Sequence, residues 1–457
     1  MKPYALIKPY FRERRRFIVI GMISLIIVDI LQLIIPRVIK RAVDDLTLLE
    51  AGTADLAGYA LSIAAIALLI GFFRFIWRHC LLGTSRRVEE GLRNRLFHHL
   101  QTLSAPYFDR ARSGDLMAHA TNDIQQVRMA AGMGLVALND AVFLGLAAIG
   151  FMAYIDVRLT LLVLIPMPLI VFGTRFFSRR MHRRYRRVQA AFAGLTESIR
   201  ERFAGIRVIK AYHWEPTEIR TIDRDSETYV RENLDLVKIT GAFFPMMALL
   251  TNLSMAIVVY FGGRQTVFGT ITPGDFVAFI SYLGLLTWPM MALGWVTNLI
   301  QRGRASLDRL AEIFQTRPSI VQPDRPRHLN RIQGRLTFEN VDFAYRPHQP
   351  VLSGLNLCIE PRTTLGIVGP PGSGKSTLLQ LIPRLYDVES GCIRLDGVNL
   401  SELDLSELRS RIAVVPQEPF LFAGTIRDNI TLGSSDVSQN RLEAVVAQAA
   451  LTDTIAA

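Results

Sequence analysis

Six long apolar stretches dominate the first 300 residues of this 457-residue chain. Each has roughly the 20 residues that an α-helix needs to cross a bilayer. They are approximately Phe17–Ile35, Leu56–Leu81, Leu135–Ile155, Leu159–Phe177, Ala242–Phe261 and Pro273–Ile300. Half of the chain (50%) is hydrophobic, which is unusual for a soluble domain. We therefore expect a polytopic α-helical membrane domain with six transmembrane helices, the last of them kinked at Pro289.

The basic residues predict how these helices are oriented. The formal net charge is +12, and arginines cluster before the first span, after the second and after the fourth. If the chain crosses six times, all three clusters lie on one side, which the positive-inside rule assigns to the cytoplasm. No aromatic set interleaves them, so nucleic acid is not an expected partner. The expected location is the inner (plasma) membrane, with an uncleaved N-terminus in the cytoplasm.

Changes in composition along the chain predict its domain boundaries. Residues 1–16 form a basic cytoplasmic elbow, 17–300 the six-helix domain, 301–334 a proline-containing linker and 335–457 a soluble α/β domain. Residues of about 83–134 and 178–241 show helical periodicity outside the spans. Each is interrupted once, around Pro106–Gly114 and Tyr212–Glu218. The pattern alone allows either two cytoplasmic hairpins or a generic helical domain.

Short β-branched runs in the last third predict strands of an α/β domain. They are Leu336–Tyr345, Leu355–Ile359, Thr363–Val368, Cys392–Leu395 and Ile412–Val415. A helical run, Ser376–Leu385, follows the third of them.

The strongest motif in the chain lies between that third strand and the helix, and it matches G-x-x-x-x-G-K-[ST]. Its residues are Gly369, Pro370, Pro371, Gly372, Ser373, Gly374, Lys375 and Ser376, followed by Thr377. Such a loop cradles phosphates with backbone N–H groups at a helix N-terminus. Lys375 is expected to reach the β- and γ-phosphates, and the Ser376 hydroxyl to ligate Mg²⁺. No guanine-specificity motif or protein-kinase catalytic loop accompanies it, so a partial P-loop NTPase domain that binds ATP and Mg²⁺ is expected.

Further motifs in this order and spacing resemble those of ATP-binding-cassette (ABC) transporters. In the soluble domain they are Val341–Arg346, Val415–Glu418 and Phe422–Ile430; in the membrane domain they are Ser113–Leu116, Thr121–Asp123 and Gly205–Tyr212. Together with the six spans, they are similar to a half-transporter of the type IV exporters, the multidrug-resistance-like group with the ABC transporter type 1 exporter fold.

The resemblance implies several roles. Tyr345 would stack on adenine, and Gln417 would contact the ATP-bound Mg²⁺ as the glutamine loop. The two interruptions would be coupling helices that transmit closure of the nucleotide domains. The subunit would work as a homodimer or heterodimer in the bilayer, as an ATP-hydrolysing translocase exporting a hydrophobic or amphipathic, drug- or lipid-like substrate by alternating access.

The 457 residues also depart from the family pattern. They contain no Leu-Ser-Gly-Gly-Gln signature, no apolar strand ending in Asp-Glu and no switch histidine after Gln417. The chain is thus interpreted as carrying the first part of an ABC nucleotide-binding domain, with no catalytic base present. The alternatives are an incomplete sequence, a short subunit completed by another chain, and a nucleotide-binding but non-hydrolysing or inactive subunit.

Substrate contacts are predicted least sharply. Polar side chains within the spans could contact the substrate or form hydrogen bonds between helices. They are Asp29, Gln32, Arg74 and Asn252. An adaptable apolar cavity could be lined by methionine and aromatic side chains, or these could simply pack between helices. They are Phe243, Phe244, Met246, Met247, Trp288, Met290 and Met291.

Overall fold

The computed structural model describes residues 3–329, 331–432, 434 and 436–456. It divides into two compact units, which are described separately. The first comprises the described residues up to Leu103 together with Tyr107–Pro318. The second comprises Ser104–Pro106 and the described residues from Ser319 onward.

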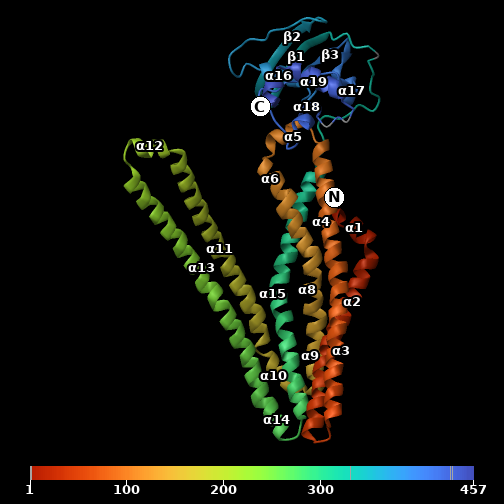
Figure 1. Ribbon diagram of the computed structural model, residues 1–457, viewed down its shortest axis with the longest axis vertical. Helices are drawn as coiled ribbons and strands as arrows, with labels where there is room; N and C mark the ends of the chain where they lie inside the picture. Colours follow the sequence, from red (N-terminus) through yellow and green to blue (C-terminus); the bar gives the residue numbers. More distant parts are fainter. Residues whose placement is uncertain (1–2, 330, 433, 435, 457) are drawn as a thin grey trace. The chain divides into compact units, whose positions relative to one another are not determined.

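Unit one contains six helical segments long and apolar enough to cross a membrane (Figure 1). They are Arg15–Thr47, Thr53–Thr102, Ser113–Ile155, Val157–Ala204, Glu215–Val267 and Pro273–Gln315. Each of the six predicted spans lies inside one of these segments, so the prediction of a six-span domain is confirmed.

Short π-helical turns and one proline divide most of these segments into labelled elements. The N-terminal elbow is η1 (Pro3–Leu6) and α1 (Lys8–Glu13), and the first segment is α2 (Arg15–Thr47). The second is α3 (Thr53–Trp77), η2 (Arg78–Leu82) and α4 (Gly83–Thr102). The third is α6 (Ser113–Ala118), η3 (His119–Asp123), α7 (Ile124–Met129), η4 (Ala130–Gly134), α8 (Leu135–Asn139), η5 (Asp140–Leu144) and α9 (Gly145–Ile155). The fourth is α10 (Val157–Leu164) and α11 (Met167–Ala204); the fifth is α13 (Glu215–Ile257), η6 (Val258–Gly262) and α14 (Gly263–Val267); the sixth is α15 (Pro273–Gln315).

Side-chain caps fix the tight turns between paired spans. Asp156 ends the third segment and caps α10 by accepting the Leu159 N–H at 2.6 Å. Thr272 and Asp275 form a capping box at the start of α15, in which the Thr272 hydroxyl accepts the Asp275 N–H at 3.0 Å. Each cap satisfies backbone donors that a helix start otherwise leaves unpaired.

The core of unit one is built where α15 packs against its neighbours. Leu144, Met152, Phe279 and Leu286 are among its fully or nearly fully buried members. Tyr282 is also buried, and its hydroxyl donates to the Leu33 carbonyl at 3.0 Å, which ties α15 to α2. The helices α11 and α13 run side by side (Figure 1).

The two predicted interruptions of the helical extensions are present, although the short helix of the second lies upstream of the predicted range. The first is occupied by α5 (Ala105–Arg110). In the second, the short helix is α12 (Ile206–Ala211), upstream of the predicted Tyr212–Glu218. The turn Tyr212–Trp214 lies inside the predicted interruption, but the short helix precedes it, because Gly205 ends α11 and Glu215 already begins α13.

Asp123 lies in the helical extension that precedes the third predicted span, and it ties this extension to the end of the sixth segment. Asp123 is buried, with only 6% of the residue exposed. It accepts hydrogen bonds from Arg309 Nε at 3.1 Å and Ser306 Oγ at 2.9 Å, and His119 Nδ1 lies 2.6 Å away. Burial acts to raise the pKa of Asp123, but the hydrogen bonds from Arg309, His119 and Ser306 outweigh it and hold that pKa below its ordinary value. The motif residue predicted from family resemblance is therefore a structural clamp.

Removing this clamp is expected to loosen unit one. Asp123→Ala should lower the free energy of unfolding by about 1–3 kcal/mol, less than for a fully buried pair because the Arg309 side chain is 49% exposed. Because the folded-state pKa is depressed, the stabilisation is present at neutral pH and is lost as the pH falls below about 4. Thermal melting in detergent from neutral to acidic pH measures both. Glu90→Ala, which breaks the exposed Arg87–Glu90 pair, should change stability by less than about 0.5 kcal/mol; an equal effect of the two variants would contradict the clamp.

Unit two contains a four-stranded antiparallel sheet in the order β2-β1-β3-β4. Its strands are β1 (Leu336–Arg346), β2 (Gln349–Ile359), β3 (Ser390–Leu395) and β4 (Val398–Asn399). Its helices are α16 (Lys375–Leu381), η7 (Leu400–Glu402), α17 (Leu405–Ser410), α18 (Ile426–Thr431), α19 (Gln439–Gln448) and α20 (Thr452–Ala456). Phe338, Val341 and Phe343 of β1 form the core with Leu378 and Leu381 of α16.

Two of the five predicted strands are not formed. Thr363–Val368 and Ile412–Val415 have apolar side chains but, among the described residues, no hydrogen-bonded neighbouring strand. Without such a neighbour the side chains stay in solvent, and Val368 is 98% and Val415 94% exposed. A short apolar run is compatible with a strand, but only non-local pairing makes it one.

Candidate functional site

The phosphate loop connects the exposed run before residue 369 to α16. Gly374 adopts φ +86°, a left-handed conformation that glycine reaches without strain. A Cβ at this position would lie 3.2 Å from the Val351 carbonyl oxygen, so the space is also restricted. The predicted helix Ser376–Leu385 is present as α16, which begins one residue earlier, at Lys375, and ends at Leu381. The loop therefore leads directly to a helix N-terminus, which favours an anionic group.

The Lys375 ammonium is folded back onto its own loop. Its Nζ donates to the carbonyl oxygens of Gly369 and Pro370, each at 2.8 Å, and lies 3.4 Å from Ser373 Oγ. These acceptors are neutral, whereas a phosphate oxygen is charged and makes a stronger hydrogen bond with an ammonium group. The arrangement holds the cation at the loop, where a phosphate could replace carbonyl partners.

Tyr345 is fixed against the same helix from the end of β1. Its hydroxyl donates to Gln380 Oε1 at 2.7 Å and lies 3.2 Å from Thr377 Oγ1. Its ring contacts Phe343 and Tyr386 edge to face, with centroids 4.8 and 5.2 Å apart. The side chain remains 38% exposed, which leaves ring surface for a ligand.

The remaining predicted site residues are not all brought together. Gln417 is exposed, and no hydrogen bond joins it to Ser376 within the described residues. The partners of Tyr345, Gln380 and Tyr386, were not among the residues predicted from the sequence. Gln380 could have been found, because it lies three residues after Thr377 and thus on the same face of α16.

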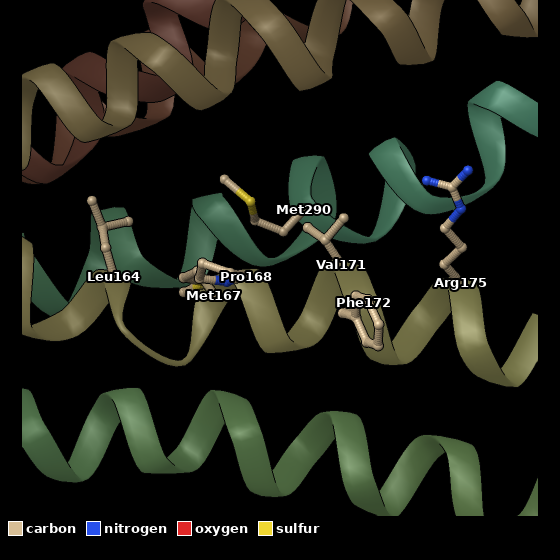
Figure 2. Close-up of a pocket in the computed structure, with 7 residues that line it drawn as sticks. All are labelled: Leu164, Met167, Pro168, Val171, Phe172, Arg175 and Met290. Atoms are coloured by element: carbon tan, nitrogen blue, oxygen red, sulfur yellow. The ribbon is translucent and has the colours of Figure 1, made fainter.

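Unit one contains a second candidate site, an apolar cavity of about 440 Å³. Figure 2 shows its lining in a row along α10 and α11, with Leu164 at one end, Arg175 at the other and Met290 facing them from α15. The other lining residues are Met167, Pro168, Val171 and Phe172. An apolar wall with one cation at its end suits an amphipathic molecule.

Only part of the predicted aromatic and methionine set lines this cavity. Met290 does. Met247 is instead buried, where the Thr174 hydroxyl lies 3.6 Å from its sulfur, and Phe243 packs on Phe177 with ring centroids 5.8 Å apart. For these two residues the contacts favour the alternative of plain helix packing.

The intramembrane Asp29 is explained by a hydrogen bond between helices. It is buried, and Asn139 Nδ2 donates to its Oδ2 at 2.9 Å. This contact joins α2 to α8 and supports the structural interpretation of this residue over a substrate contact.

Sequence comparison defines the class of protein to which this bundle and loop belong. A model of the ABC transporter transmembrane region matches residues 18–290, and a second model, described as ABC transporter, matches residues 352–456. The chain therefore belongs to the ABC transporter family and has the exporter fold, a six-helix membrane domain with a partial P-loop NTPase domain.

Individual relatives narrow the group to multidrug-resistance-like half-transporters. The multidrug resistance-like ATP-binding protein MdlA of Escherichia coli is 34% identical over 457 residues, covering 100% of this chain and 77% of the relative. A probable multidrug resistance ABC transporter ATP-binding/permease protein, YheI of Bacillus subtilis, is 31% identical over 94% of this chain and 74% of its own length. An ATP-dependent lipid A-core flippase of Syntrophus aciditrophicus is 30% identical over 93% and 70%, respectively.

Proposed function

We propose that this chain is a subunit of an ATP-driven exporter that moves a hydrophobic or amphipathic substrate out of the cytoplasm by alternating access. The observation that carries the proposal is the loop from Gly369 to Lys375, which holds a cation at a helix N-terminus in a chain that also contains six membrane spans. The names of the relatives support export, and the arginine clusters support a cytoplasmic N-terminus and nucleotide-binding domain in the inner membrane.

In the proposed complex, two half-transporters pair as a homodimer or heterodimer. The phosphate loop would hold MgATP, with Ser376 and Gln417 as the candidates for contact with Mg²⁺ and Tyr345 as the platform for adenine. The helices α5 and α12 are the candidate coupling elements, because each is a short helix between two long helical segments. Binding of ATP would supply the closing step, and hydrolysis the reset.

The residues present support binding of ATP more than its hydrolysis. We propose that these 457 residues alone hold MgATP without turning it over, because they include neither the family's signature nor an Asp-Glu strand. Turnover would then require those groups from elsewhere. A nucleotide-binding, non-hydrolysing subunit is the alternative function that this composition supports.

The adenine role of Tyr345 has a measurable consequence. Tyr345→Ala should weaken MgATP binding about tenfold, because stacking on a base contributes roughly 1–3 kcal/mol. Tyr345→Phe should retain most of the affinity, since it keeps the ring and loses only the contacts with Thr377 and Gln380. Titration with a fluorescent ATP analogue measures both variants, and tripolyphosphate, which has no base, should bind all three proteins equally. Unchanged ATP affinity in Tyr345→Ala would refute the role.

The proposed substrate class can be tested at the cavity of Figure 2. Val171→Trp should fill the cavity and weaken the binding of a lipophilic fluorescent dye to the purified chain about tenfold. Leu169→Trp is the matched control, because Leu169 lies on the same helix, is exposed and does not line the cavity. Equal dye binding by the two variants would exclude this cavity as the substrate site.

A further inference from the structure

A second pocket lies at the end of unit one where spans one and two, three and four, and five and six are joined by tight turns. It has a volume of about 180 Å³ and lies among α2, α9 and α15. Seven of its lining side chains are charged or aromatic: Arg37, Lys40, Arg41, Phe151, Tyr154, Asp275 and Tyr282. Neither the family motifs nor the ATP site accounts for it.

The charges in this pocket do not balance. Lys40 Nζ lies 2.5 Å from Asp275 Oδ1, so the single carboxylate of the lining is already paired. The same carboxyl group also takes part in the capping box of α15. Within the part of the chain that the structure describes, no acidic side chain forms an ion pair with Arg37 or Arg41. The pocket therefore carries two positive charges that lack a carboxylate partner.

Aromatic rings hold one of these two guanidinium groups in place. The guanidinium carbon of Arg37 lies 4.8 Å from the centre of the Phe151 ring and 5.3 Å from that of Tyr154. Stacking uses the flat face of a guanidinium. One part of its N–H edge faces the Tyr282 hydroxyl, and the remaining N–H groups are left for a planar or tetrahedral oxyanion. The residues come from helices more than 100 positions apart in sequence, and only the fold assembles the pocket.

The position of the three cations adds to the argument. They follow the first span at the end opposite to the arginine clusters that indicate the cytoplasmic side, where the positive-inside rule disfavours lysine and arginine. Simple interfacial anchors could lie anywhere around the bundle. These three instead face one pocket beside the membrane interface, where phosphate headgroups lie.

We propose that this pocket binds a phosphate group, presented either by the headgroup of an anionic phospholipid or as free phosphate. Arg37 and Arg41 supply the charge-assisted hydrogen bonds, and Phe151 and Tyr154 hold Arg37 in position. Lys40 stays paired with Asp275 and keeps α2 and α15 together at the pocket wall. This site is independent of the proposed transport function, because it uses neither the ATP loop nor the cavity of Figure 2.

Native mass spectrometry of the full chain in detergent tests the proposal. The wild type should bind phosphatidylglycerol about tenfold more tightly than phosphatidylcholine. The Arg37→Gln/Arg41→Gln double variant should lose that preference. Arg264→Gln is the matched control, because Arg264 also stacks on a ring, Phe268, near the same end of the bundle but does not line the pocket. It should bind both lipids as the wild type does.

Competition identifies the source of the phosphate. If inorganic phosphate displaces phosphatidylglycerol from the wild type but not from the double variant, free phosphate suffices; if excess phosphate leaves the lipid bound, the headgroup must come with its acyl chains. Both results support the proposed phosphate site.

Both arginines are exposed, so folding should survive their replacement. If the double variant nevertheless melts at a lower temperature than the wild type, the lipid preference of the single variant Arg41→Glu is measured instead. Undiminished phosphatidylglycerol preference in a folded variant, or no preference in the wild type, would overturn the proposal.

Discussion

Lys375→Ala is expected to weaken MgATP binding about a hundredfold, the largest effect of any substitution in unit two that leaves the fold intact. The lysine is the one ammonium group at the phosphate loop in the described structure, and it already lies within 2.8 Å of two loop carbonyls. Exchanging these neutral acceptors for charged phosphate oxygens strengthens its hydrogen bonds in the bound state. A hundredfold loss corresponds to about 2.7 kcal/mol.

Equilibrium titration with a fluorescent ATP analogue measures this loss. Arg411→Ala is the control, because Arg411 is an exposed cation of the same unit whose side chain has no hydrogen bond or ion pair among the described residues. It should leave affinity within about twofold, as expected of an exposed charge. Tight ATP binding by Lys375→Ala, with a normal melting temperature, would show that the loop is not the nucleotide site.

Gly391→Ala is expected to be the most destabilising single-methyl substitution in unit two. Gly391 has φ +75°, and an added Cβ would lie 2.2 Å from the Asn340 carbonyl oxygen and 2.3 Å from that of Glu339. These atoms are backbone of β1 at a point where the β1–β3 register shifts, so they cannot turn aside as a side chain would. The left-handed conformation costs about 1–2 kcal/mol for alanine, and the backbone clash adds to it, for a total of about 3 kcal/mol or more.

A second glycine separates the two contributions. Gly397 also has a positive φ, +84°, but a Cβ added there would meet no other atom within 4 Å. Gly397→Ala should therefore lose only about 1–2 kcal/mol. Denaturant unfolding of the purified chain measures the loss of stability in each variant. The nucleotide affinity of the folded variants, which depends on Tyr345 of β1, provides a second readout. Equal losses from the two substitutions would mean that β1 and β3 do not approach as closely as described.

The sequence predicted best what depends on local pattern. All six spans were found, because a run of about 20 predominantly apolar residues is the length that a membrane-spanning helix requires and is rare in soluble domains. The phosphate loop was predicted from its glycines and lysine, and α16 begins at Lys375, one residue before the predicted start at Ser376. The short helix α12 was placed a few residues too late, because its end is set by the turn at Tyr212–Trp214 rather than by a marked change in composition.

What could not be predicted depends on contacts between distant residues. Thr363–Val368 has the composition of a strand but lacks a pairing neighbour among the described residues. The fold-back of Lys375 onto loop carbonyls is a matter of geometry, as is the hydrogen bond between Asp29 and Asn139. The pocket around Arg37 is lined by residues of α2 and α9 that lie more than 100 positions apart, and no periodicity in the sequence predicts it.

Binding and turnover of MgATP can be measured together on one preparation of the 457-residue chain in lipid nanodiscs. Saturable binding of one nucleotide per chain is expected, weakened about a hundredfold by Lys375→Ala, with phosphate release no faster than in that variant. Absence of saturable binding, or Lys375-dependent phosphate release by the chain alone, would contradict it.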